Sequence, residues 1–159
     1  MIKKISSTVL LFAIMALFVP YASMADYSTG NGFTPVTTRS NNSFDKTVDN
    51  LKKLVSKNGM MVMGEINQGN IMSMAGVNMK AASFFIGSPV VGKKLFGSDV
   101  GATVAAPFRV TVYEDKGGST YISYFKPSDL LGSFNGDKLT MAAGELDKKM
   151  AMLTSMAGE

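Results

Sequence analysis

Apolar positions recur with a helical period in two segments of the chain. In the first, Phe44, Val48 and Leu51 lie three or four residues apart, which predicts an amphipathic helix. Ser43 stands where an N-cap belongs, and Asn58 with the glycine after it supplies a stop. The second segment is C-terminal, and the apolar positions on its shared face are Leu139, Ala142, Ala143, Leu146, Met150, Leu153 and Ala157. We therefore predict two long amphipathic helices, the second at the C-terminus.

Other apolar runs are short and bounded by turn residues, which is typical of strands. The clearest is a hairpin, in which residues 108–114 (FRVTVYE) alternate and residues 120–125 (TYISYF) return after a turn. Three further strands are predicted, a first edge strand over 36–40 and two more over 60–66 and 81–86.

Shorter segments connect these strands. We predict a turn over residues 67–70, a short helix over 71–75, and another turn over 126–129. Ser88 followed by Pro89 predicts the start of a helix that runs to residue 96. The order of elements indicates an α+β domain, with one antiparallel sheet and helices packed on one face.

The N-terminus has the three parts of a secretory signal peptide. Lys3 and Lys4 precede an uncharged apolar run over residues 8–19, and small residues precede a cut after Ala25. A membrane anchor is the alternative, but a span needs about 20 apolar residues. We therefore expect a periplasmic or secreted protein with no stable membrane anchor after cleavage. Residues 26–35 would be a flexible lead-in and residues 36–157 a single domain.

Composition narrows the chemistry that this domain can perform. The chain has no His, no Cys and no Trp, which excludes thiol nucleophiles, Ser–His triads and histidine zinc sites. Without disulfides, a hydrophobic core alone must stabilise the domain. Carboxylates remain, and a carboxylate-dependent hydrolase would need two of them in one cleft. A non-catalytic module is therefore favoured over an enzyme.

Charge gives little support for nucleic-acid binding. The formal net charge is +4, and cleavage of the signal would remove the two positive charges of Lys3 and Lys4. No run of five like charges follows, so we expect no nucleic-acid partner.

Three blocks of sequence resemble a known family. They are residues 44–66 (FDKTV…NGMMV…EI), residues 85–95 (FIGSPVVGKKL), and residues 106–127 (APFRV…VYED…TYISY…P). In this order they resemble the domain-of-unknown-function 302 family over about residues 36–156. The resemblance implies an α+β fold of the TATA-binding-protein-like class and a homodimer. It implies no catalytic residues, and Ser88 stands where the family often has Asn.

Methionine is unusually frequent, with 13 residues, three of them in the predicted signal. Thioethers select Cu(I) among metal ions, and strand alternation places Met61 and Met63 on the same face. One hypothesis is therefore a soft-metal or apolar-ligand carrier that uses Met61, Met63, Met72 and Met74. The other is that methionine fills core gaps or lines an adaptable apolar surface. Apart from Cu(I) in the first hypothesis, we expect no cofactor.

A candidate ligand site lies between the methionine-rich strand and the next helix start. It comprises Met61, Met63, Glu65, Gly87, Ser88 and Lys93. The N–H groups of the helix start could bind an anion, although an ordinary helix cap has the same sequence. We expect an exported binding or interaction module whose ligand is a small molecule or a protein partner.

Overall fold

The computed structural model of the chain describes residues 33–134 and 136–159. The predicted signal peptide and most of the predicted lead-in lie outside these residues. No helix in the described ranges is long and apolar enough to cross a membrane.

In the described part of the chain, the strands form one antiparallel sheet of five in the order β1-β5-β4-β3-β2. Strands β2 to β5 are neighbours in the sheet in the same order as in the sequence. The first strand, β1, instead lies at the edge beside the last, β5. The strands are β1 (Val36–Arg39), β2 (Met61–Asn67), β3 (Ala81–Gly87), β4 (Phe108–Glu114) and β5 (Thr120–Tyr124). All five predicted strands, including the edge strand, are confirmed.

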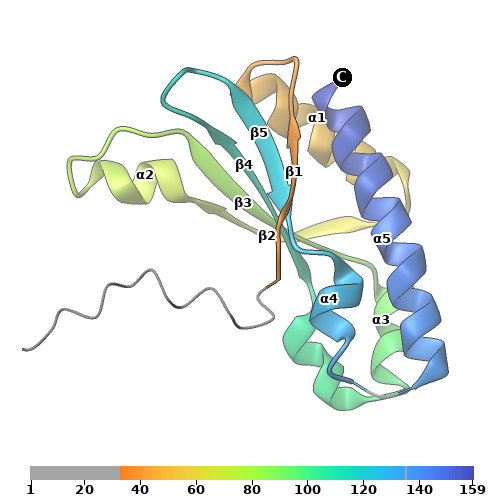
Figure 1. Ribbon diagram of the computed structural model, residues 1–159. Coiled ribbons are helices and arrows are strands. Elements are labelled where there is room, and N and C mark those ends of the chain that lie inside the picture. Colours follow the sequence, from red (N-terminus) through yellow and green to blue (C-terminus); the bar gives the residue numbers. More distant parts are fainter. Residues whose placement is uncertain (1–32, 135) are drawn as a thin grey trace, which may run out of the picture. The chain divides into compact units, whose positions relative to one another are not determined.

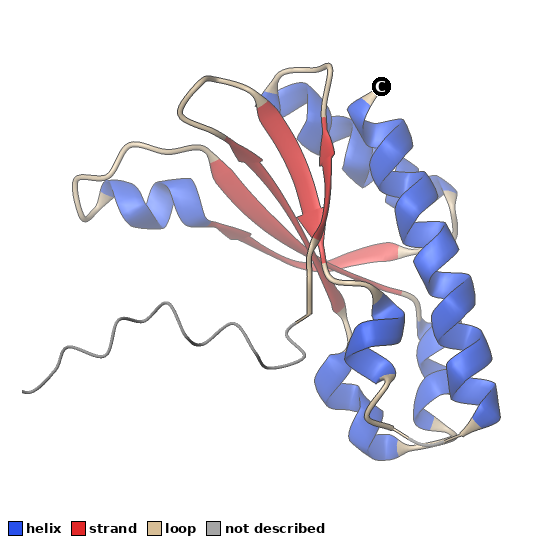
Figure 2. Cartoon of the chain, viewed as in Figure 1, coloured by secondary structure: helices blue, strands red, loops and turns tan. Residues whose placement is uncertain are grey.

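Helices cover one face of this sheet, as Figures 1 and 2 show for α1 and α5. The covering elements are α1 (Phe44–Lys57), α3 (Pro89–Phe96), the short 3-10 helix η2 (Val100–Ala105), α4 (Pro127–Leu131) and α5 (Asp137–Gly158). Helix α2 (Gln68–Ser73) instead projects away from α5 beyond the far end of β2 (Figure 1). The predicted α+β architecture with helices on one face is confirmed.

The core lies between the sheet and these helices. Alternate residues of the central strands, such as Phe84 and Val110, are fully buried against Leu51 and Val55 of α1. The predicted face of α5 is also buried, except that Ala142 is half-buried. Each fully buried large apolar side chain contributes roughly 1.5–3 kcal/mol. These side chains therefore supply the stability that disulfides give to other small domains.

Helix α1 forms where its pattern predicts. The Ser43 Oγ accepts a hydrogen bond from the Lys46 N–H at 3.4 Å, and Asp45 lies in the first turn beside the positive end of the helix dipole. Asn58 ends the helix, and Gly59 follows with φ of +68°, a conformation that glycine adopts without strain.

Two segments predicted as turns are helical in the structure. Residues 68–70 belong to α2, and the Asn67 side chain accepts a hydrogen bond from the Asn70 N–H at 2.9 Å. Residues 127–129 belong to α4, where Asp147 of α5 accepts hydrogen bonds from the N–H and Oγ of Ser128 at 2.9 and 2.5 Å. Asn, Ser and Pro favour both turns and helix starts, so these residues did not distinguish the two.

Candidate ligand-binding site

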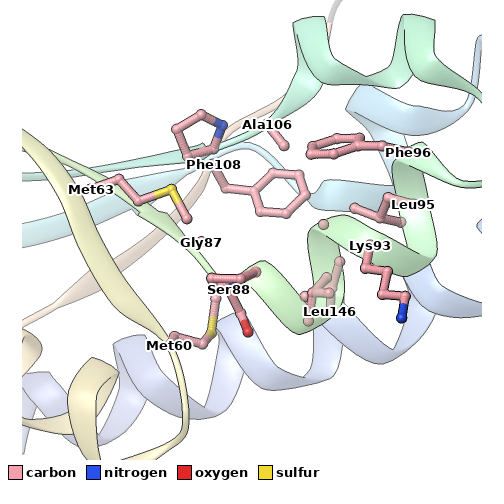
Figure 3. Close-up of a pocket in the computed structure, with 14 residues that line it drawn as sticks. Met60, Met63, Gly87, Ser88, Lys93, Leu95, Phe96, Ala106, Phe108 and Leu146 are labelled. Carbon is pink, nitrogen blue, oxygen red and sulfur yellow. The ribbon is translucent and has the colours of Figure 1, made fainter.

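A pocket of about 370 Å³ lies where β3 runs into α3 (Figure 3). Residues from β2, β3, α3, β4 and α5 meet there. The lining residues are Met60, Met63, Gly87, Ser88, Pro89, Val91, Gly92, Lys93, Leu95, Phe96, Ala106, Pro107, Phe108 and Leu146. Most of this surface is apolar, so the pocket suits the hydrocarbon part of a ligand.

The turn from β3 into α3 forms one wall of the pocket. β3 ends at Gly87, Ser88 is the extended N-cap residue, and Pro89 takes the first helical position, as predicted. A Cβ atom at Gly87 would lie 2.8 Å from the Met63 Cε and 3.0 Å from its Sδ. Glycine at this position therefore lets the Met63 side chain lie directly over the backbone of β3.

A β-bulge in β2 sets the position of Met63. In the pairing with β3, Val62 lies opposite Ile86 and Gly64 opposite Phe85, so Met63 is the extra residue. Met63 lines the pocket, whereas Met61 does not, although both are about half exposed. The bulge interrupts the strict alternation on which the predicted same-face placement rested, and only Met63 of this pair lines the pocket.

Polar side chains in the pocket are few. Ser88 is 8% exposed, and in the described structure its hydroxyl makes no cap hydrogen bond to α3. Lys93 is exposed, and Figure 3 shows its amino group across the view from the Met63 thioether, with the Phe108 ring between them. One hydroxyl and one ammonium group are thus the polar side-chain groups that could orient a ligand.

The structure brings together four of the six residues in the predicted ligand site, namely Met63, Gly87, Ser88 and Lys93. Met61 and Glu65 are not among the lining residues. Glu65 instead forms an ion pair with Lys52 of α1, with 2.7 Å between the Glu65 Oε2 and the Lys52 Nζ. Its role is to join β2 to α1.

Sequence reasoning missed the lining residues that come from elsewhere in the chain, such as Met60, Phe108 and Leu146. All three are apolar, and Leu146 belongs to the apolar face predicted for the C-terminal helix. That they line one pocket depends on the packing of α5 and β4, which no local pattern encodes.

The four methionines of the Cu(I) hypothesis do not form one site in the structure. Met61 and Met63 lie near the start of β2, whereas Met72 and Met74 follow its end, on α2 and at its C-cap. The seven residues of β2 span roughly 20 Å, and α2 extends onward from there (Figure 1). Met74 is 82% exposed, whereas Met60 and Met150 are buried in the core. Methionine thus serves both as core filler and as apolar surface.

Several carboxylates have structural partners. Glu114 pairs with Lys80 at 3.1 Å, and the Asp115 carboxylate accepts hydrogen bonds from the N–H groups of Gly117 and Ser119 in the hairpin turn. Within residues 33–134 and 136–159, no three acidic side chains come close enough to hold a metal ion. No carboxylate is among the described residues that line the pocket.

The family described as Domain of unknown function DUF302 matches residues 36–157. The chain belongs to this family. The resemblance noted in the sequence is thereby confirmed, although the family's description names no ligand or reaction.

A solved structure supports the same fold. The crystal structure of an uncharacterized conserved protein DUF302 from Bacillus stearothermophilus is similar with a TM-score of 0.72. Its sequence is 18% identical, and the match covers 77% of this chain and 97% of that chain. At this identity the likeness shows the fold of the DUF302 domain alone. No curated protein matches the chain.

Proposed function

We propose that this DUF302 domain is an exported, non-catalytic binding module that holds a small apolar ligand in the pocket between β2, β3 and α3. The observation that carries the proposal is the pocket itself. Its volume of about 370 Å³ and its largely apolar lining are those of a small-molecule site. Apolar ligand surface that leaves water there would contribute roughly 25 cal/mol per Å².

The methionines support an adaptable binding surface. Met60 and Met63 both line the pocket, and unbranched thioether side chains fit irregular apolar shapes by rotating. Met63 is 49% exposed, so it can move without disturbing the core. In this proposal methionine serves an apolar-ligand carrier, and no metal ion is required.

The polar side chains of the pocket favour binding over catalysis. Ser88 and Lys93 are the polar side chains of the pocket. Activation of a serine needs an adjacent base, and the Lys93 amino group lies well apart from the Ser88 hydroxyl in Figure 3. A hydrolase of the glycosidase type needs two carboxylates. A ligand that is held and released needs neither. Export enters the proposal from the sequence of residues 1–25.

A substitution that fills the pocket tests the proposal. The probe is N-phenyl-naphthylamine, a neutral apolar dye that fluoresces on leaving water. We expect saturable one-to-one binding to the unaltered protein. Met63→Trp places a bulky indole in the pocket and should weaken binding by about tenfold, which is about 1.4 kcal/mol. Fluorescence titration measures this change.

The matched control is Met61→Trp. Met61 lies on the same strand and is 48% exposed, against 49% for Met63, but it does not line the pocket. The control should bind the dye as the unaltered protein does. Equal binding by both variants, or an equal loss in both, would show that the dye does not occupy this pocket.

A further inference from the structure

Lys93 lies where the apolar pocket meets a second hollow. This neighbouring hollow has a volume of about 520 Å³ and lies between the end of α3 and the start of α5. Its charged lining residues are Lys93, Lys94, Lys138 and Glu145. Because Lys93 lines both hollows, a ligand whose apolar part fills the pocket could extend past Lys93 to these residues.

The second hollow carries net positive charge, with three lysines against the single carboxylate of Glu145. In the described residues the ion pairs are Lys52 with Glu65 and Lys80 with Glu114, and the three lysines take part in neither. An anion placed between them would therefore gain favourable electrostatic interactions.

Helix stability accounts for only some of these lysines. Lys93 and Lys94 lie in the last turn of α3, where positive charge complements the helix dipole. Lys138 is the second residue of α5, near the positive end of that helix, where a lysine is unfavourable. The helix dipole therefore does not account for a lysine at this position.

We propose that the ligand is an amphipathic anion, with an aliphatic part in the apolar pocket and a single acidic head group at Lys93, Lys94 and Lys138. This inference rests on the proposed function, because it names the class of molecule that the same pocket holds. The aliphatic part would pass the Phe108 ring on the way from Lys93 toward Met63, which lies opposite in Figure 3.

The expected electrostatic contribution is modest, because Lys93 and Lys94 are exposed to solvent. An exposed charge pair changes an equilibrium by a few fold at most and weakens as salt rises. We therefore expect the three lysines together to favour an anionic ligand by about tenfold at low salt. The apolar pocket would provide most of the affinity.

Ligands that share a decyl chain but differ in their head group test the inference. Decanoate, decyl phosphate, decanol and decyltrimethylammonium compete with N-phenyl-naphthylamine for the unaltered protein. We expect the two anions to compete about tenfold better than decanol, and the cation to compete least. The advantage of the anions should shrink when salt rises from about 0.05 M to about 0.5 M. The ratio of decyl phosphate to decanoate reports which acid is preferred.

Lysine substitutions test where the acidic head group binds. Lys93→Gln should weaken decanoate by about threefold. The Lys94→Gln, Lys138→Gln double variant, which leaves the lining of the apolar pocket intact, should remove most of the preference for anions while leaving decanol unchanged. The control is Lys116→Gln, an exposed lysine in the hairpin turn at the other end of β4, which should change nothing.

The possible results separate the two proposals. If decanol competes as well as decanoate, the anion inference is overturned and the apolar binding function stands. If the double variant keeps its full preference for anions, the placement of the head group at these lysines is overturned. If neither the dye nor any alkyl compound binds, the proposed function itself fails.

Discussion

Tyr124 is the buried residue whose ionisation the fold changes. Its side chain belongs to the core on the helix-covered face of the sheet and is 4% exposed. Burial raises the pKa of Tyr124 above the ordinary 10.0, a hydrogen bond with Thr154 acts in the opposite direction, and the negative charge of Asp147 adds to the rise. Removing the proton would place a charge in a low-dielectric core, which is costly.

We expect ionisation of this tyrosine to lower the free energy of unfolding at alkaline pH. Its pKa is higher in the folded than in the unfolded chain, so its contribution is fully present below pH 10.0 and is lost as pH rises toward the folded pKa. Denaturant unfolding between about pH 8 and pH 11 measures the loss, and Tyr124→Phe should show a shallower decline. Other groups titrate in both proteins, so only the difference between the two declines reports on Tyr124. Equal declines would contradict a raised pKa for Tyr124.

At the scale of elements, α1 and α3 begin in different ways. The Ser43 side chain accepts a hydrogen bond from the first turn of α1, whereas in the described structure Ser88 makes no such bond and faces the pocket. The start of α3 is instead set by Pro89, whose fixed φ suits the first helical position. The two serines look equivalent in sequence but have different roles.

Alanine substitutions separate these roles. Ser43→Ala removes a cap and should lower the free energy of unfolding by about 0.5–1 kcal/mol, at the lower end of the usual range because the bond is 3.4 Å long. Ser88→Ala loses no cap bond, so its change should stay below about 0.5 kcal/mol. Urea denaturation of both variants gives the comparison. A larger loss for Ser88→Ala would mean that its hydroxyl has a structural partner.

At the scale of the whole described domain, over residues 33–134 and 136–159, helices cover only one face of the sheet. One face is sealed by helices, and the other is stabilised by side-chain pairs that tolerate water. The Tyr113 and Tyr121 rings stack with centroids 5.5 Å apart, and hydroxyl pairs join Thr37 with Ser123 and Ser83 with Thr111. Stability therefore comes from one layer of core, and folding in an oxidising compartment would need no disulfide chemistry.

The proposed export predicts how the N-terminus of the chain is processed. Mass spectrometry of the protein recovered from the exported fraction should give a chain that begins at Asp26. Leu11→Arg places a charge in the apolar run over residues 8–19, so this variant should remain uncleaved in the cytoplasm. An exported chain that retains Met1 would contradict cleavage of a signal peptide.

Most of the fold could be predicted from local patterns. The two long helices and the hairpin strands have regular apolar periods, and the other strands are short runs bounded by turn residues. Caps and turns mark the ends of these elements, as at Ser43 and Gly59. The failures at α2 and α4 have one physical cause, because Asn67 and Pro127 suit a turn and a helix start equally. At α4 the Asp147 carboxylate stabilises the helical N-terminus from 19 residues away in sequence.

The sequence by itself determined the α+β class, the family, and the start of α3, which forms one wall of the pocket. Each of these is recognised from residues that lie close together in the chain. Only the tertiary structure decided that Met63, and not Met61, lines the pocket together with Met60, since the bulge at Met63 arises from pairing with β3. It also decided that Leu146 of α5 lines the same pocket as Gly87. Contacts of this kind depend on how distant elements pack, and no period along the chain records them.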